Sequence, residues 1–250
     1  KLEGTARSGA SGLELAIDAG QHWTRRLSKG ARTQLRRQAS DLGLAFSSLC
    51  INAHWVFNMT SPDVRIRDLG ISLLVESVEL AHDLDAGVIL VPGCDQEESP
   101  ASRWALFRSA LMQAITPAEQ AGVVLGLEAV GRPFLSNSRK LRRMIEACGG
   151  SQALGIYLDV GNATAGLMDP AAEIRTAGNR AAMVHVKDWD PADRGKAFLG
   201  AGAVDWARCL PALKEVSFDG YLTVELAADR SDPEKVARES VRFLQSMLGH

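Results

Sequence analysis

Four apolar segments of the chain each end in a side chain that can bind a metal ion. They are GVVLGLE, which ends at Glu128, LGIYLD, which ends at Asp159, AAMVH, which ends at His185, and YLTVE, which ends at Glu225. Three carboxylates and one imidazole form a set of mostly hard oxygen ligands, which suits Mn²⁺, Mg²⁺, Co²⁺ or Zn²⁺ better than copper or an iron–sulfur cluster. If the four segment ends meet in space, the pattern predicts a site for one divalent metal ion.

Each of these residues also has an ordinary structural alternative. Asp159 stands before a glycine-containing turn and could cap a helix, Glu225 could pair with an arginine, and His185 alone would more often be a core histidine. A carboxylate at the end of an apolar strand is nevertheless unfavourable to bury unless it is paired or coordinated. Four such ends in four consecutive strand-like segments therefore favour one shared explanation, which is metal binding.

These segments belong to a regular alternation of apolar runs and helical periodicity. Strands are expected at residues 12–17, 45–51, 86–93, 122–128, 154–159, 181–185 and 221–225, and helices at residues 32–42, 69–84, 104–120, 138–150 and 204–216. This alternation predicts a parallel sheet, and strands that are apolar nearly throughout are typical of a sheet covered on both faces. In a (β/α)₈ TIM barrel the carboxyl ends of the strands converge on one face, which would bring the four residues together. We therefore predict an α/β protein with one TIM-barrel domain over residues 1–250.

A doubly wound open sheet is the alternative to a barrel. Such a sheet usually carries a glycine-rich phosphate loop after its first strand, and no GxGxxG motif follows residues 12–17. Seven strands are one fewer than a closed barrel needs, and residues 1–11 resemble the end of a helix. We therefore expect that the first strand of the barrel, with any site residue it carries, is missing from the N-terminus of this sequence.

Composition and charge narrow the function classes. The net charge is −2 and the 28 basic residues are scattered, so the sequence lacks the basic stripe that nucleic-acid binding needs. The four cysteines are widely spaced without a CxxC pair, which fits neither a disulfide framework nor a zinc finger. No apolar run approaches the roughly 20 residues of a membrane helix, and the start carries no hydrophobic signal segment. We expect a cytoplasmic protein that binds neither nucleic acid nor membranes, and a homo-oligomer stays open.

Longer stretches of the chain resemble the xylose-isomerase-like sugar isomerases and epimerases. The resemblance rests on LGLEAVGRPFLSNSRKL, YLDVGN, MVHVKD with LGAGAVDWARCLPALK, and GYLTVEL, and also on GLELAIDAGQHWTRRLS and SSLCINAHWVF. The closest likeness is to the L-ribulose/L-xylulose-5-phosphate 3-epimerases, and it covers almost the whole chain. The resemblance implies a (β/α)₈ barrel with one divalent metal ion bound at Glu128, Asp159, His185 and Glu225, and it implies that the two glutamates also move protons.

The chemistry that this resemblance implies is proton transfer next to a ketose carbonyl. That hydrogen is weakly acidic and is removed only if the enediolate oxygens are stabilised, which a divalent cation does as a Lewis acid. Inverting a carbon centre needs a base on one face and an acid on the other, and Glu128 and Glu225 are the expected catalytic pair. Asp159 and His185 are then expected to be ligands alone. The expected substrate is a small-molecule sugar or sugar phosphate, and the expected enzyme is an isomerase of the 3-epimerase type.

Four further residues are candidates for substrate binding: His54, Lys187, Asp188 and Arg194. His54 is a candidate through the resemblance alone, Asp188 could equally be a cap, and Lys187 and Arg194 could equally be surface residues. The loop at residues 200–202 leads into a helix, whose free N–H groups could hold a phosphate. Alternatively, its two glycines only form a turn. Residues 189–191 are bulkier and more acidic than the resemblance leads us to expect, which leaves the sugar and its phosphate open.

Other functions use the same groups. An aldose–ketose isomerase or a polyol dehydratase on this scaffold would need the same metal and carboxylates. A metal-dependent endonuclease of the same barrel type would need more histidines for a multi-zinc cluster than the five present. A sugar-binding protein without turnover would be indicated by the loss of a ligand or a glutamate, and none is lost.

Overall fold

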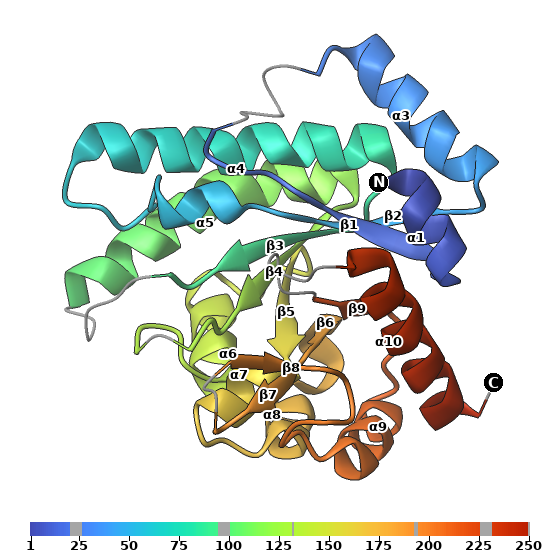
Figure 1. The fold of residues 1–250 in the computed structure, drawn as a ribbon. Helices are drawn as coiled ribbons and strands as arrows, with labels where there is room; N and C mark the ends of the chain where they lie inside the picture. Colours follow the sequence, from blue (N-terminus) through green and yellow to red (C-terminus); the bar gives the residue numbers. More distant parts are fainter. Residues whose placement is uncertain (21–26, 95–100, 132, 193–194, 226–231, 250) are drawn as a thin grey trace.

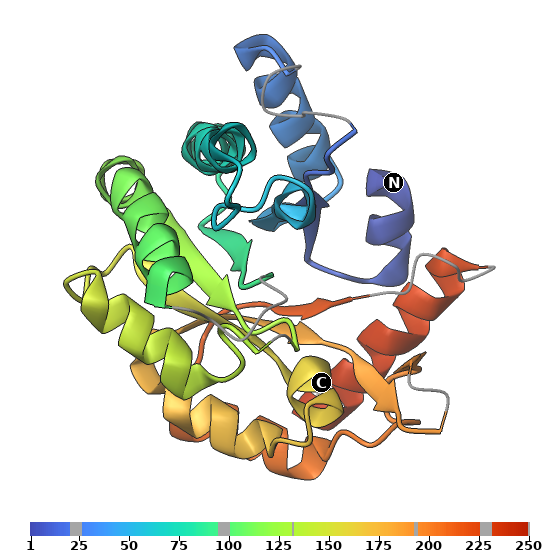
Figure 2. The ribbon, with the colours of Figure 1, turned by 90° about the vertical axis from the view of Figure 1, so that its left-hand side faces the viewer.

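The computed structural model describes residues 1–20, 27–94, 101–131, 133–192, 195–225 and 232–249. Its centre is a seven-stranded sheet in the order β1-β2-β3-β4-β5-β6-β9, in which each strand is parallel to its neighbours. The strands are β1 (Gly12–Ala16), β2 (Ala45–Cys50), β3 (Val88–Pro92), β4 (Val124–Glu128), β5 (Leu154–Asp159), β6 (Ala181–Val186) and β9 (Leu222–Val224). The sheet curves into a nearly closed barrel with helices around its outside (Figures 1 and 2). The predicted seven strands and the barrel class are confirmed, whereas the strand expected upstream stays a prediction.

The five predicted helices are confirmed with small shifts in their ends. They are α3 (Lys29–Asp41), α4 (Val64–Leu84), α5 (Ala101–Ala121), α6 (Ser138–Ala147) and α9 (Trp206–Glu215). The opening residues form α1 (Leu2–Ser8), as their helix-like pattern indicated. This first helix packs against the last one, α10 (Pro233–Leu248), where Arg7 Nη2 lies 2.6 Å from Glu234 Oε1. Among the described helices, none is long and apolar enough to cross a membrane.

Several short elements were not predicted. They are η1 (Asn52–Trp55), α7 (Val160–Ala165), α8 (Pro170–Ala177), η2 (Gly178–Arg180) and an antiparallel pair formed by β7 (Asp188–Asp190) and β8 (Gly195–Ala197). Helix α10 was not predicted either, although α8 and α10 both begin with an Asp-Pro pair. The aspartate side chains accept from backbone N–H groups of the first turn, and proline is well suited to the first helical position. The signal for both helices was therefore present in the sequence.

Strand β3 shows why the strands are apolar nearly throughout. All five of its residues are buried. Val88 and Leu90 pack with Tyr157 and Met183 in a small cluster inside the barrel. Ile89 and Val91, which alternate with them, belong to the large core between the sheet and the helices. Both faces of the sheet are therefore covered at β3, whereas the edge strands β1 and β9 are only partly buried.

Candidate metal centre

The barrel brings the predicted ligands to one end of the sheet. Glu128 and Asp159 are the last residues of β4 and β5, and the register pairs Asp159 with His185 on β6. Glu225 directly follows β9, where its backbone N–H donates to Val186 O at 3.1 Å. Because all these strands are parallel, their carboxyl ends lie on the same face of the barrel. The four residues expected to share a site therefore do so.

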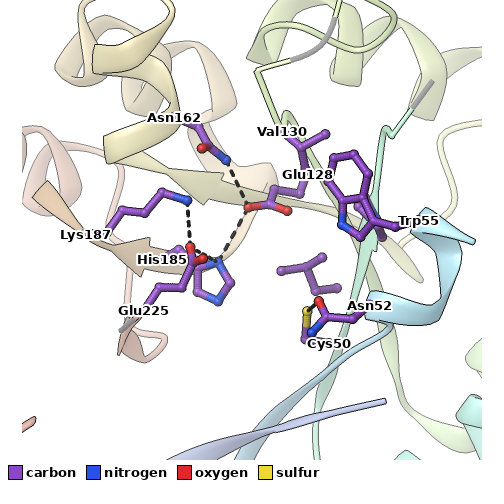
Figure 3. Close-up of a pocket in the computed structure, with 11 residues that line it drawn as sticks. Cys50, Asn52, Trp55, Glu128, Val130, Asn162, His185, Lys187 and Glu225 are labelled. Atoms are coloured by element: carbon purple, nitrogen blue, oxygen red, sulfur yellow. Dashed lines mark hydrogen bonds and ion pairs between the residues drawn. The ribbon is translucent and has the colours of Figure 1, made fainter. Parts of the chain in front are cut away.

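His185 lies at the middle of this group (Figure 3). Its Nδ1 atom is 3.5 Å from Glu128 Oε1, 3.6 Å from Glu225 Oε2 and 3.9 Å from Asp159 Oδ2. Candidate ligand atoms of Glu128, Asp159 and His185 all lie within 4.8 Å of one another. Within the described part of the chain, Nδ1 is buried and makes no hydrogen bond of good geometry. A buried, unsatisfied ring nitrogen among three carboxylates fits a divalent cation, which would take its lone pair.

The two carboxylate oxygens of Asp159 face different partners. Its Oδ1 accepts from Asn162 N at 2.8 Å and caps α7, while its Oδ2 faces His185. The capping alternative considered for this residue and the ligand prediction are therefore compatible. Asn162, which the sequence did not single out, also donates from Nδ2 to Glu128 Oε1 at 3.4 Å and to Ala129 O at 3.3 Å. The first turn of α7 thus holds two of the predicted ligands in place.

Burial controls the charge of this cluster. The side chains of Asp159, His185 and Glu128 are 0%, 5% and 7% exposed, and that of Glu225 is 30% exposed. Burial raises the pKa of Glu128 to about 7, although His185 and Lys187 oppose the shift. Burial alone would lower the pKa of His185, but the carboxylates of Glu14 and Glu128 raise it well above its ordinary value. Positive charge is therefore favoured at the centre of the cluster, whether a proton or a metal ion carries it.

Lys187 supplies further positive charge to the predicted ligands. Its Nζ lies 2.8 Å from Asp159 Oδ2 and 2.7 Å from Glu225 Oε2, and its side chain is only 11% exposed. Gly161 makes room for it, because a Cβ atom at this position would lie 2.4 Å from Lys187 Cγ. Although burial opposes it, the charges of Asp159 and Glu225 raise the pKa of Lys187. Lys187 also lines the pocket, and its contact with a substrate oxygen stays a prediction.

Glu14 is a site residue that the sequence analysis missed. It lies on β1, and its Oε1 is 2.9 Å from His185 Nε2, on the opposite side of the ring from the candidate metal ligands. Its Oε2 accepts from Ser48 Oγ and from Tyr157 Oη, each at 2.8 Å. The only sequence signal was a carboxylate inside the apolar run GLELAI. Strand β1, on which no site residue was predicted, therefore contributes directly to the site.

Asp188 is occupied by hydrogen bonds within the protein. It is 1% exposed and accepts from Trp206 Nε1 and from the backbone N–H groups of Trp189, Gly200 and Val204, at 2.9 to 3.0 Å. It therefore organises the loop before α9. The N–H groups of Ala201 and Ala203 donate to Phe198 O and Trp189 O. Since four N–H groups of this loop already have acceptors, phosphate binding there is not favoured, and a substrate contact of Asp188 stays a prediction.

His54 lies on η1 and is 1% exposed. Its Nε2 is 3.1 Å from Gly70 O on α4, and its Nδ1 has no hydrogen-bond partner in the part of the chain that the structure describes. Burial lowers its pKa from 6.5 to about 4. The observed contact is thus with the helix layer, and a contact with substrate stays a prediction. Arg194, the fourth candidate, lies outside the described residues.

The pocket above the cluster is lined by side chains from several strand ends and from η1: Cys50, Asn52, Trp55, Leu90, Pro92, Glu128, Val130, Asn162, His185, Lys187 and Glu225 (Figure 3). The lining is charged where Glu128, His185, Lys187 and Glu225 face the pocket, and it is apolar at Leu90 and Pro92 of β3. Trp55 is 44% exposed and lies across the pocket from Lys187. The arrangement suits a small polar molecule that meets the charged cluster with one edge.

The chain matches the family described as the xylose isomerase-like TIM barrel over residues 2–247. The chain belongs to this family. Among curated proteins it is similar to the L-ribulose-5-phosphate 3-epimerase UlaE of Escherichia coli (strain K12), with 27% identity over 230 residues, covering 88% of this chain and 78% of that protein. The corresponding protein of Salmonella heidelberg (strain SL476) is 26% identical with the same coverage.

Solved structures with the same fold include an L-ribulose 3-epimerase, with a TM-score of 0.83, 22% identity and coverage of 99% of this chain and 87% of that one. A D-psicose 3-epimerase in the presence of D-fructose has a TM-score of 0.82 at 18% identity, with 100% and 93% covered. The 3-keto-D-glucoside 4-epimerase YcjR of E. coli has a TM-score of 0.77 at 18% identity, with 96% and 90% covered. At these identities the structural likeness establishes the fold.

The position of Lys187 predicts that it stabilises the metal-free protein. In Lys187→Met the buried Asp159 carboxylate loses its cation, and removing one partner of a buried ion pair typically costs about 3–5 kcal/mol. We expect a lower melting temperature in EDTA and a larger rise on adding Mn²⁺ than in the wild type. The control is Lys235→Met, which breaks an exposed pair with Glu239. Equal melting temperatures for the two variants in EDTA would contradict this prediction.

The burial of His54 predicts a loss of stability in acid. Because its pKa is about 4 in the folded protein against 6.5 ordinarily, the unfolded chain binds the proton more tightly. The free energy of unfolding should therefore fall as the pH decreases from 6.5 to 4, by on the order of 3 kcal/mol from this group. Urea denaturation at several pH values should show a steeper fall for the wild type than for His54→Gln, which cannot titrate. Parallel curves would show that His54 is not responsible.

Proposed function

We propose that the protein is a divalent-metal-dependent epimerase that acts on a ketose or ketose phosphate by proton transfer at the carbon next to the carbonyl. The observation that supports it most strongly is the meeting of Glu128, Asp159, His185 and Glu225 at the carboxyl ends of parallel strands, beside a pocket that Glu128, His185 and Glu225 line. The printed names of its relatives, which are sugar 3-epimerases, support the same reaction class. The enzyme would be an isomerase.

Glu128, Asp159, His185 and Glu225 would hold the cation. When bound, a divalent ion stabilises negative charge on neighbouring sugar oxygens as the C–H bond breaks, and it could be Mn²⁺, Mg²⁺, Co²⁺ or Zn²⁺. The donor set fits such an ion, because His185 Nδ1 is buried, has no hydrogen-bond partner among the described residues and faces three carboxylates. Asp159 and His185, the least exposed of the four, are proposed as ligands alone.

Glu128 and Glu225 are proposed to move the protons. They stand on β4 and beyond β9, with β5 and β6 between them in the sheet, so they approach the pocket from two sides. Epimerisation needs this arrangement: one carboxylate takes the proton from the carbon on one face, and the other carboxyl group returns a proton to the opposite face. The pKa of Glu128, about 7 in the protein without a cation, shows that its buried position favours the protonated form.

Substrate contacts are proposed for residues around this pair. Lys187 and Asn162 line the pocket and donate hydrogen bonds toward the ligand carboxylates, so either can meet a sugar oxygen. Lys187 is the one cationic lysine or arginine among the described residues of the pocket lining, and it already pairs with Asp159 and Glu225. This pairing favours recognition of hydroxyl and carbonyl oxygens at the cluster, and a phosphate group would need a different part of the pocket.

An aldose–ketose isomerase would use the same carboxylates and the same cation. The two reactions differ in the carbon that gains the proton, which depends on how the ketose lies between Glu128 and Glu225. The names of the relatives favour the carbon of a 3-epimerase. A panel of pentuloses, hexuloses and their phosphates, scored by product identity, distinguishes the two.

The proposed function predicts hydrogen exchange at the substrate carbon. In D₂O the protein should catalyse exchange of the hydrogen next to the carbonyl of at least one ketose, measured by proton NMR. Exchange should stop in EDTA and return when Mn²⁺ is added in excess, because the enediolate loses its stabilising charge without the ion. A protein that exchanges no ketose in the panel, with Mn²⁺ present, would refute the proposed function.

The assignment of Glu225 predicts separable effects on binding and chemistry. Glu225→Gln keeps an oxygen ligand but cannot transfer a proton, so exchange should fall by about 10²–10⁴-fold while most of the metal affinity remains. The matched control is Glu239→Gln, at an exposed carboxylate on α10. Near wild-type exchange by Glu225→Gln would exclude this residue from the proton transfer.

A further inference from the structure

We propose that Glu14 is a positioning residue that fixes the ring of His185 for metal binding. The inference rests on the metal centre of the proposed function and adds a residue from β1 to it. Glu14 Oε1 lies 2.9 Å from His185 Nε2, whereas Nδ1 of the same ring faces Glu128, Glu225 and Asp159. Each nitrogen of the imidazole therefore has one separate function.

The tautomer of the ring follows from this division. A neutral imidazole carries a single N–H, and a carboxylate can only accept a hydrogen bond. With Glu14 at Nε2 the proton is held there, so the lone pair of Nδ1 is left for the cation. A carboxylate behind a metal-binding histidine also fixes the ring orientation and raises the basicity of the ligand nitrogen.

Glu14 is itself held rigidly enough for this function. Ser48 Oγ and Tyr157 Oη both donate to its Oε2 at 2.8 Å, which leaves Oε1 for the histidine. The side chain of Glu14 is only 14% exposed. Tyr157 in addition packs its ring against the imidazole, with centroids 4.6 Å apart and an interplanar angle of 56°. The imidazole of His185 is thus fixed by a hydrogen bond at one edge and by an aromatic face.

The two hydroxyl donors make Glu14→Gln an informative substitution. If the amide oxygen stays where Ser48 and Tyr157 donate, the NH₂ group faces His185 Nε2 and favours the tautomer protonated at Nδ1, in which Nδ1 has no lone pair for a metal. If the amide turns round, its NH₂ group faces the two hydroxyls and their donated hydrogen bonds are lost. Either orientation removes one group of hydrogen bonds that the carboxylate accepts, from His185 or from the two hydroxyls, without changing the size of the side chain.

The test compares Mn²⁺ affinity by calorimetric titration for the wild type, Glu14→Gln and Glu14→Ala. Loss of such a supporting carboxylate is expected to weaken metal binding by about 10–100-fold. The matched control is Glu119→Gln, whose carboxylate accepts from Ser151 Oγ at 2.7 Å at the opposite end of the strands. This control should bind Mn²⁺ as the wild type does. Unchanged affinity in both Glu14 variants would overturn the inference.

A second measurement separates positioning from a general loss of structure. In protein labelled with ¹⁵N-histidine and loaded with diamagnetic Zn²⁺, the wild type should show one ring with a protected Nε2–H and a metal-bound Nδ1. Glu14→Ala should lose the protection of that proton while circular dichroism shows a folded protein. A protected Nε2–H in Glu14→Ala would overturn the inference.

The outcome is separable from that of the proposed function. If the wild type binds Mn²⁺ but exchanges no ketose, the proposed function fails, whereas the effect of Glu14 on affinity still stands. If exchange occurs and the Glu14 variants bind Mn²⁺ normally, only the Glu14 inference fails. A wild type that binds neither Mn²⁺ nor Zn²⁺ would refute both.

Discussion

The carboxylates of Glu128 and Asp159 are buried beside each other and need positive charge close by. An ionised carboxylate in a poorly solvated site is unfavourable by itself, and a like charge next to it makes it more so. The protein meets this need in three ways that the structure shows together: the pKa of Glu128 rises, the pKa of His185 rises, and the ammonium group of Lys187 lies against Asp159. A divalent cation would replace all three with one charge at the centre of the ligands. A cation that binds there would therefore have to stabilise the carboxylates more than protons and Lys187 already do.

The barrel creates this constraint through its strand geometry. Parallel strands end together, so the last inward residue of each strand faces the same small volume. Directly below it, the interior is filled by Val88, Leu90, Tyr157 and Met183. This apolar layer lies beneath the carboxylates, and the pocket opens above them. The same alternation places Ile89 and Val91 against the outer helices, so the packing that stabilises the barrel and the burial of the acidic cluster arise from one strand pattern.

The features that the sequence analysis predicted are those with a local signal. Strands, helices and the four candidate ligands were visible because an apolar run that ends in a polar residue is a property of a few neighbouring residues. Glu14 was missed because its importance depends on His185, which is 171 positions away and meets it only when the sheet curves. His54 also ends an apolar run, but η1 turns its side chain toward Gly70 O instead of into the pocket lining. Asp188 was a candidate for substrate contact because it follows His185 by three positions. Its role as the acceptor for backbone N–H groups of the loop before α9 could not be inferred from spacing.

We expect the choice of substrate to depend on the residues that line the pocket around the candidate ligands. Structures of this fold include proteins named as 3-epimerases of L-ribulose and D-psicose and one named as a 4-epimerase of a 3-keto-glucoside, so the fold does not determine which carbon reacts. In the proposed reaction the carbon must lie between the carboxyl groups of Glu128 and Glu225, and the walls of the pocket would decide which carbon that is. In this chain those walls include Trp55 and Val130, which are not among the candidate ligands. Since a side chain of this kind selects by shape, substitutions at Trp55 should redistribute activity among ketoses, whereas substitutions at the ligands should reduce it for all of them.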